Sequence, residues 1–275
     1  MKNLQLALLG ALLSVGSVWA GESCSLSLAG AWKATLSDGR SQVVRLPGSI
    51  SEQGLGNAIT LDTPWTLSLR PGWRAAWPEV VAHPENVKMP FFLTPSHYYV
   101  GKVVFTRTID VPDAAKGRLA ELFLERAHWC SVVFVDGVEK GRGEALSAPQ
   151  KIPLGELAPG RHELRLEIDN AIHAINPGIN AHSISDHIAG NWNGAIGRLA
   201  IDFRARDEIA SVKLTPDRAT RTLIAEVRTA SGKRGVVTQP MPLNVEDWDE
   251  FHPNLYTAEI AFGGDVKKVR YGVRS

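Results

Sequence analysis

Apolar and polar side chains alternate with a period of two along most of this chain. In residues 161–169, His162, Leu164, Leu166 and Ile168 fall on one face, and charged residues fall on the other. This alternation is typical of a β-strand with one buried face. No stretch after residue 20 keeps a 3.6-residue period, so the sequence predicts an all-β protein of the antiparallel sandwich type. The same alternation runs through residues 101–112, 119–127, 130–141 and 197–205.

The pattern changes near residues 204–208, and this change predicts two units. A first sandwich is expected over residues 21–205 and a small immunoglobulin-like sandwich over residues 206–275. The second unit has about 70 residues, against about 100 for a complete domain of that type. Residues 231–247 resemble turns more than strands, so the second unit is expected to be incomplete. Its three clear strand patterns are residues 211–217, 221–229 and 254–262.

The first twenty residues predict a secretory signal peptide. Lys2 precedes an apolar run from Leu4 to Leu13, and small residues lead to Ala20, after which cleavage is expected. The run is shorter than the roughly 20 apolar residues that a membrane span needs. Cys24 is not preceded by the residues of a lipid-attachment site. We therefore expect a secreted or periplasmic protein with no membrane association once residues 1–20 are removed.

Composition narrows the possible partners. The chain is 44% hydrophobic and 21% charged with a formal net charge of +1, so nothing in its charge favours nucleic acid or acidic lipid as a partner. It has two cysteines, Cys24 and Cys130. An oxidising compartment permits a disulfide between them, but the sequence does not show whether their Cβ atoms meet. A disulfide and two separate buried thiols both stay open.

Several segments occur in an order that is found in one known family. They are the Gly-x-Trp of residues 28–36, the Leu-Pro-Gly-Ser turn of residues 46–49, the aromatic pair and strand of residues 90–112, the Asp-Gly turn of residues 136–137, the Asp-Asn of residues 169–170, and residues 179–201. In this order they resemble the amino-terminal sugar-binding domain of glycoside hydrolase family 2, the β-galactosidase, β-glucuronidase and β-mannosidase family. Residues 248–275 resemble the last strands of that family's immunoglobulin-like second domain. The resemblance covers nearly all of the chain after residue 20, and it implies a jelly-roll, galactose-binding-like sandwich for the first unit.

The resemblance also bears on catalysis. In that family the tail of the second domain runs into a (β/α)₈ barrel of about 250 residues. Retaining glycosidases use two carboxylates, which in this family are glutamates on barrel strands. No residue here corresponds to them, so no catalytic residue is predicted, and Glu125 and Glu163 are interpreted as residues on strand faces. Whether this chain acts as an enzyme by itself stays uncertain.

The resemblance therefore implies the non-catalytic, carbohydrate-binding portion of a secreted family 2 β-glycosidase. Its expected partners are the non-reducing end of a β-linked glycan and a catalytic barrel in the same or another chain. Two alternatives stay open. The chain could be a stand-alone, lectin-like sugar-binding protein, or it could be an inert truncated fragment.

Residues 169–194 form the richest polar stretch of the chain. Amide and carboxylate groups match the paired hydroxyls of a sugar ring, and an indole offers a flat apolar face for stacking on it. In the family, the matching loop helps to line the sugar subsite. The resemblance thus implies sugar-binding roles for His182, Asp186, Asn191, Trp192 and Asn193.

Two other interpretations of this stretch stay open. His173, His182 and Asp186 offer nitrogen and oxygen ligands to a metal, but their spacing matches no dedicated zinc pattern, and no metal or other cofactor is predicted. Alternatively, Asn, Asp and Ser side chains hold turns through bonds to nearby backbone, and Trp192 closes the end of the sandwich.

Other aromatic residues give further expectations. His97, Tyr98 and Tyr99 precede a strand at a position that lies near the barrel in the family, and they are a secondary candidate wall for the sugar. Large aromatic side chains usually fill a core or an interface. We favour that role over an exposed glycan platform for the three tryptophans that lie close together, Trp65, Trp73 and Trp77. We also expect a core position for Trp32 and Trp129.

Overall fold

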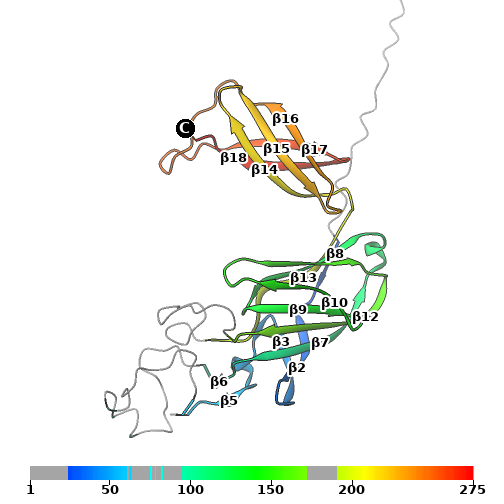
Figure 1. Cartoon of the computed structure of the whole chain (residues 1–275), viewed down its shortest axis with the longest axis vertical. Helices are drawn as coiled ribbons and strands as arrows, with labels where there is room; N and C mark the ends of the chain where they lie inside the picture. The colour runs from blue at the N-terminus through cyan, green and yellow to red at the C-terminus, as the bar shows by residue number, and fades with distance from the viewer. Residues whose placement is uncertain are drawn as a thin grey trace, which may run out of the picture.

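The computed structural model describes residues 24–60, 62–63, 75, 78, 82, 95–171 and 191–274. Its named elements are β-strands and two short 3₁₀ helices, Ser51–Gln53 and Asp113–Ala115 (Figure 1). All pairs of neighbouring strands in its sheets are antiparallel. The prediction of an all-β sandwich is therefore confirmed. The predicted signal peptide and Trp65, Trp73 and Trp77 lie outside the described residues.

Two sheets face each other in the first sandwich. The six-stranded sheet has the order β10-β9-β12-β7-β2-β3, and the opposing five-stranded sheet has the order β1-β13-β8-β11, with β4 paired to β13. The strands of the first sheet are β2 (Gly30–Leu36), β3 (Ser41–Leu46), β7 (Lys102–Val111), β9 (Cys130–Val135), β10 (Val138–Glu144) and β12 (Gly160–Asp169). Those of the second are β1 (Cys24–Ser27), β4 (Gly48–Ser49), β8 (Leu119–Ala127), β11 (Gln150–Glu156) and β13 (Gly194–Arg204), while β5 (Asn57–Ala58) pairs with β6 (His97–Tyr98) beside them.

The alternation in the sequence accounts for the core between these sheets. In β12, Leu164, Leu166 and Ile168 are fully buried, and the charged residues between them face outward. Trp32 is also fully buried, and its Nε1 donates to the Leu28 carbonyl at 3.0 Å. Trp129 is 5% exposed, so both tryptophans lie in the core as predicted. Burial of such side chains contributes roughly 25 cal/mol for each Å² of apolar surface removed from water.

The strand registers bring several connections to one end of the first sandwich. Asp169, at the end of β12, lies opposite Cys130 and Lys102, where β9 and β7 begin. In the other sheet, Ala195 near the start of β13 lies opposite Ala127 at the end of β8. We call this end, made of residues 48–51, 97–102, 127–130, 169–171 and 191–195, the loop end.

The second unit is a smaller sandwich with its own apolar cluster. Three strands, β14 (Ile209–Asp217), β15 (Thr222–Thr229) and β16 (Arg234–Pro240), form one sheet, and β17 (Tyr256–Phe262) pairs with β18 (Asp265–Tyr271). The buried members of its apolar cluster run from Ile209 to Val273, whereas those of the first sandwich run from Leu28 to Phe203.

The expectation that residues 231–247 are mostly turn is wrong over β16, which pairs with β15 from Arg234 to Pro240. The sequence pattern did not predict this strand because its inward-facing positions lack a series of large apolar residues. At Gly235, the Phe262 ring fills the inward space, and a Cβ there would lie 2.2 Å from that ring. The neighbouring chain thus supplies the apolar group that the strand itself lacks.

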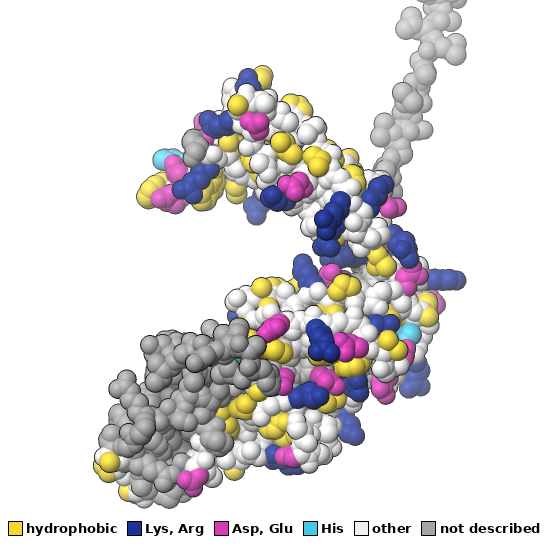
Figure 2. All heavy atoms as spheres, viewed as in Figure 1, with side chains coloured by type: hydrophobic (Ala, Val, Ile, Leu, Met, Phe, Trp, Pro, Cys, Tyr) yellow, Lys and Arg dark blue, Asp and Glu magenta, His cyan; other side chains and the backbone are white. Residues whose placement is uncertain are grey.

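The two cysteines are free and partly exposed. Cys24 lies in β1 and Cys130 in β9, which belong to different sheets. Of the two alternatives, the structure contains separate thiols, although neither is fully buried. Within the part of the chain that is described, no helix has the length and apolar character needed to cross a membrane. In the view of Figure 2, acidic and basic side chains are interspersed over both units.

His162 joins two turns of the first sandwich. Its Nδ1 lies 2.6 Å from Asp136 Oδ2, and its Nε2 lies 2.7 Å from the Ala158 carbonyl oxygen. A carboxylate and a carbonyl can only accept, so both bonds form together only when the imidazole carries two N–H groups. The bond to Asp136 and the bond to Ala158 raise the pKa of His162, and the bond to His162 lowers the pKa of Asp136.

We predict that His162→Gln destabilises the protein in a pH-dependent way. The raised pKa of His162 gives a contribution that is complete below about pH 6.5 and is lost as pH rises through the folded-state pKa. The lowered pKa of Asp136 gives a contribution that is present above about pH 3.9 and is lost as pH falls. The difference in melting temperature between wild type and variant should be largest between these limits and smaller at pH 9. An equal difference at pH 5.5 and pH 9 would contradict this account.

Candidate functional site

Asn170 is the centre of a polar cluster at the loop end. It directly follows β12 and has no exposed surface. Its Oδ1 accepts from the Gly101 backbone N–H at 2.8 Å. Its Nδ2 donates to the Tyr99 carbonyl at 2.9 Å and to the Trp192 carbonyl at 3.2 Å. One side-chain amide thus ties the segment before β7 and the segment before β13 to the end of β12.

Asn191 and Asn193, two of the predicted sugar ligands, also direct their amides inward. Asn193 is 1% exposed, and its Nδ2 donates to the carbonyls of Gly101 at 2.9 Å and Ile168 at 3.2 Å. Asn191 is buried too, and its Nδ2 donates to the Asn170 carbonyl at 3.1 Å. Both side-chain donors are therefore used by the protein's own backbone.

Gly194 lets this cluster lie close against β4, the short strand that pairs with the start of β13. Its φ is +137°, and a Cβ at this position would lie 2.3 Å from the Gly48 carbonyl oxygen. The adjacent Asn193 carbonyl accepts from the Ile50 backbone N–H at 3.0 Å. Residues 191–194 are thus fixed between the β12 end and the turn that carries β4.

Trp192 stands between two buried asparagines but is itself only partly buried. Its ring centroid lies 4.8 Å from that of the buried His128, with the two planes tilted by 46°. Trp129, which follows His128 in the chain, donates from its backbone N–H to the Asp169 carbonyl at 3.1 Å and from Nε1 to the Ala171 carbonyl at 3.0 Å. The indole of Trp192 therefore has a fixed backbone and a ring support while part of it reaches solvent.

The secondary candidates differ in accessibility. His97 is partly exposed and lies in β6 opposite Ala58. Tyr98 is 3% exposed and so cannot present its ring to a ligand. The Tyr99 hydroxyl lies 2.9 Å from the Lys102 carbonyl and accepts from the Ser37 backbone N–H at 3.1 Å, which uses it within the protein.

The remaining sequence-predicted residues cannot be placed. His182 and Asp186 lie outside the described residues, as does His173, the third group of the alternative metal interpretation. Among the residues that are described, no group of three His, Cys, Asp or Glu side chains could hold a metal ion.

Sequence reasoning placed Asn170 in the polar stretch of residues 169–194 but did not single out Asn170 or His128 as site residues. The available signal for Asn170 was its position directly after an alternating strand pattern. Backbone groups at such a position no longer pair within the sheet and need other hydrogen-bond partners, which a polar side chain can supply. His128 carried no comparable signal, because a single histidine between two strands does not reveal which ring it will contact.

We predict that Asn170→Ala destabilises the protein by about 2 kcal/mol, because partly buried backbone groups of Gly101, Tyr99 and Trp192 lose their partner. Thermal or urea unfolding measures this. Asn57→Ala is the matched control, since Asn57 is exposed and accepts one bond, from Arg40 Nη2 at 2.7 Å. If both variants lost the same small amount of stability, the central role of Asn170 would be wrong.

Comparison with known proteins gives a likeness in structure. No protein-family model matches the chain, and no curated protein sequence matches it. The solved β-glucuronidase of Faecalibacterium prausnitzii has a TM-score of 0.55 at 16% identity, covering 92% of this chain and 46% of that one. The β-D-glucuronidase of Dictyoglomus thermophilum gives 0.51 at 15% identity, over 91% of this chain and 44% of the other.

A third match is the Ruminococcus gnavus β-glucuronidase in complex with uronic deoxynojirimycin. It has a TM-score of 0.55 at 12% identity, covering 92% of this chain and 45% of that one. This chain thus spans less than half the length of each of the three enzymes. At these identities the likeness is one of fold: the chain shares the fold of a part of these β-glucuronidases, in agreement with its resemblance to family 2.

Proposed function

We propose that this chain is the non-catalytic, carbohydrate-binding portion of a secreted β-glycosidase of the family 2 type. In this proposal the loop end of the first sandwich helps to hold the non-reducing sugar of a β-linked glycan. A catalytic barrel, in the same or another chain, supplies the two carboxylates that cleave the bond.

The position of Trp192 carries the proposal. An aromatic ring binds a sugar by covering its C–H face, and it does so at lower entropic cost when the ring is already held in place. The bonds of Asn170, Asn191 and Asn193 hold the backbone on both sides of Trp192. The contact with His128 supports one side of its ring.

The geometry refines the roles proposed for the other residues. Asn191 and Asn193 are positioning residues, because their amide donors are engaged with backbone carbonyls. His97 is the accessible member of the secondary group and is proposed as a polar contact. His182 and Asp186 keep their proposed role as sugar ligands on the basis of the sequence resemblance.

The structural neighbours favour a carbohydrate as the ligand. The Ruminococcus gnavus β-glucuronidase forms complexes with uronic isofagomine and with D-glucaro-d-lactam. A β-glucuronide is therefore the first ligand to test here. We further propose, from the composition of residues 1–20, that the chain is exported after removal of a signal peptide.

We predict that methyl β-D-glucuronide or methyl β-D-galactoside binds to the wild-type chain, and that Trp192→Ala weakens this binding about tenfold through loss of the stacking surface. Saturation-transfer NMR identifies the sugar that binds, and titration calorimetry gives its affinity. Phe251→Ala is the matched control, because Phe251 is an 81% exposed aromatic residue in the second unit. It should leave sugar binding unchanged.

Two results would overturn the proposed site. One is the absence of sugar binding to the folded wild-type chain at millimolar concentration. The other is equal binding by wild type and Trp192→Ala, which would place any sugar elsewhere on the molecule.

A further inference from the structure

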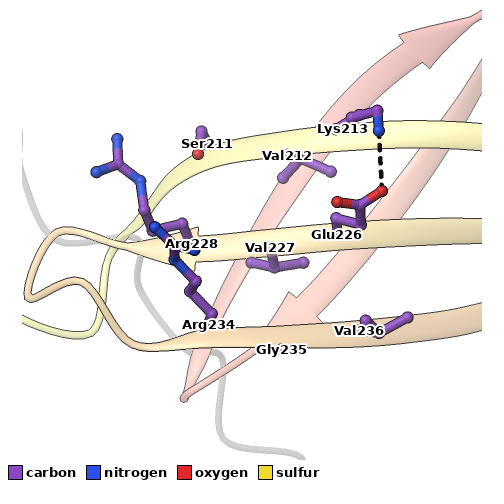
Figure 3. A pocket seen from close by; sticks show the side chains of 9 residues that line it. All are labelled: Ser211, Val212, Lys213, Glu226, Val227, Arg228, Arg234, Gly235 and Val236. Atoms are coloured by element: carbon purple, nitrogen blue, oxygen red, sulfur yellow. Dashed lines mark hydrogen bonds and ion pairs between the residues drawn. The ribbon is translucent and has the colours of Figure 1, made fainter.

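The outward face of the β14-β15-β16 sheet carries a groove of about 500 Å³ (Figure 3). The groove crosses the three strands. One wall is the row Ser211, Arg228 and Arg234, which the strand registers place side by side. The other wall, two residues further along each strand, is Lys213, Glu226 and Val236. Outward rows two residues apart are separated by about 6.5 Å, which sets the width of the groove.

The floor between these walls is mostly backbone. The intervening row is Val212, Val227 and Gly235. Val227 is buried against the core of the second unit, and Gly235 is covered on its inner side by the Phe262 ring. A ligand in the groove would thus meet peptide groups beneath it and long polar side chains on both sides.

The charges of the two walls are not balanced. Lys213 Nζ pairs with Glu226 Oε1 at 3.0 Å, which neutralises both. Arg228 and Arg234 lie directly opposite each other on neighbouring strands, and both are exposed. Among the described residues, neither arginine forms an ion pair with a carboxylate, whereas Arg198, Arg204 and Arg206 each do.

Arg228 and Arg234 occupy directly opposed positions on neighbouring strands, and like charges at such positions are destabilising. An anion between them removes that cost, and guanidinium groups bind carboxylates through two parallel hydrogen bonds. The same groove offers the Ser211 hydroxyl and the side chain of Val236, which is 65% exposed. Cationic, hydroxyl and apolar groups together match a uronic acid ring, which presents a carboxylate, hydroxyls and a C–H face.

We propose that this groove binds the carboxylate-bearing sugars of an acidic polysaccharide, with Arg228 and Arg234 as the carboxylate ligands. A stretch across three strands spans about 10 Å, enough for roughly two sugar units. The groove is built from residues 211–236 and shares none with the loop end, so the proposal stands apart from the sugar site of the first sandwich.

The test uses the full chain and oligogalacturonates of about six units as the probe. Titration calorimetry should show binding that weakens as salt concentration rises, because exposed charges are screened. The same oligomers with methyl-esterified carboxylates should bind at least about tenfold more weakly, since the charge-assisted bonds are lost.

Variants locate the binding. Arg228→Ser with Arg234→Ser should weaken oligogalacturonate binding roughly tenfold or more, and replacement of both by Lys should restore part of it. The matched control removes the same charge from two other exposed arginines, Arg161→Ser with Arg270→Ser. It should bind like wild type. Melting temperatures no lower than that of the wild type establish that the variants fold.

Several outcomes would overturn the proposal. They are a lack of binding by the wild-type chain, equal binding of the esterified oligomers, or equal loss in the control variant, which would indicate net charge alone. Binding of heparin oligosaccharides without binding of oligogalacturonates would indicate that the groove recognises sulfate groups and not carboxylates. That result would also contradict the proposal.

Discussion

The first sandwich depends on how the backbone N–H and carbonyl groups find hydrogen-bond partners beyond the ends of the strands. At the loop end the chain leaves one sheet after β12 and enters the other at β13, so the ladders cannot pair these peptide groups. The Asn170 amide replaces the missing ladder by accepting from Gly101 and donating to Tyr99 and Trp192. Buried peptide groups that lack hydrogen-bond partners lower the stability of the fold. The amide of Asn170 has both a donor and an acceptor, so it can bond to backbone carbonyls and to a backbone N–H.

At the loop end, different residues therefore have different roles: some support the backbone, and one is accessible to a ligand. Buried asparagines bond to backbone and fix the path of residues 191–194, whereas Trp192 between them keeps part of its ring accessible. The same residue types that bind sugars can therefore serve to position a single aromatic side chain. The many polar residues of the stretch 169–194 thus include side chains that support the backbone as well as candidate sugar ligands.

The sequence was sufficient for the strands with a complete apolar face, such as β12 with Leu164, Leu166 and Ile168. It failed at β16, because the apolar group that covers Gly235 comes from Phe262, far along the chain. The division of the chain near residues 204–208 stays a prediction, as do the jelly-roll topology and the signal peptide.

At the candidate site, the polar stretch was predictable but the orientation of its side chains was not. An asparagine amide can face a ligand or a carbonyl, and the partner of Asn193 is Gly101, 92 positions away. Such contacts follow from the packing of the two sheets and leave no local pattern. The sugar-binding roles of His182 and Asp186 also stay predictions, since these residues lie outside the described part of the chain.

The central claim is that the Asn170 amide holds the loop end together, and the Gly101 backbone N–H reports on it directly. Its hydrogen bond to Asn170 Oδ1 is 2.8 Å long and comes from outside any strand ladder. Amide hydrogen exchange followed by NMR should find Gly101 protected to nearly the same degree as the core strands, because its release requires the cluster to open. Exchange of Gly101 at the rate of an exposed loop amide would contradict the account.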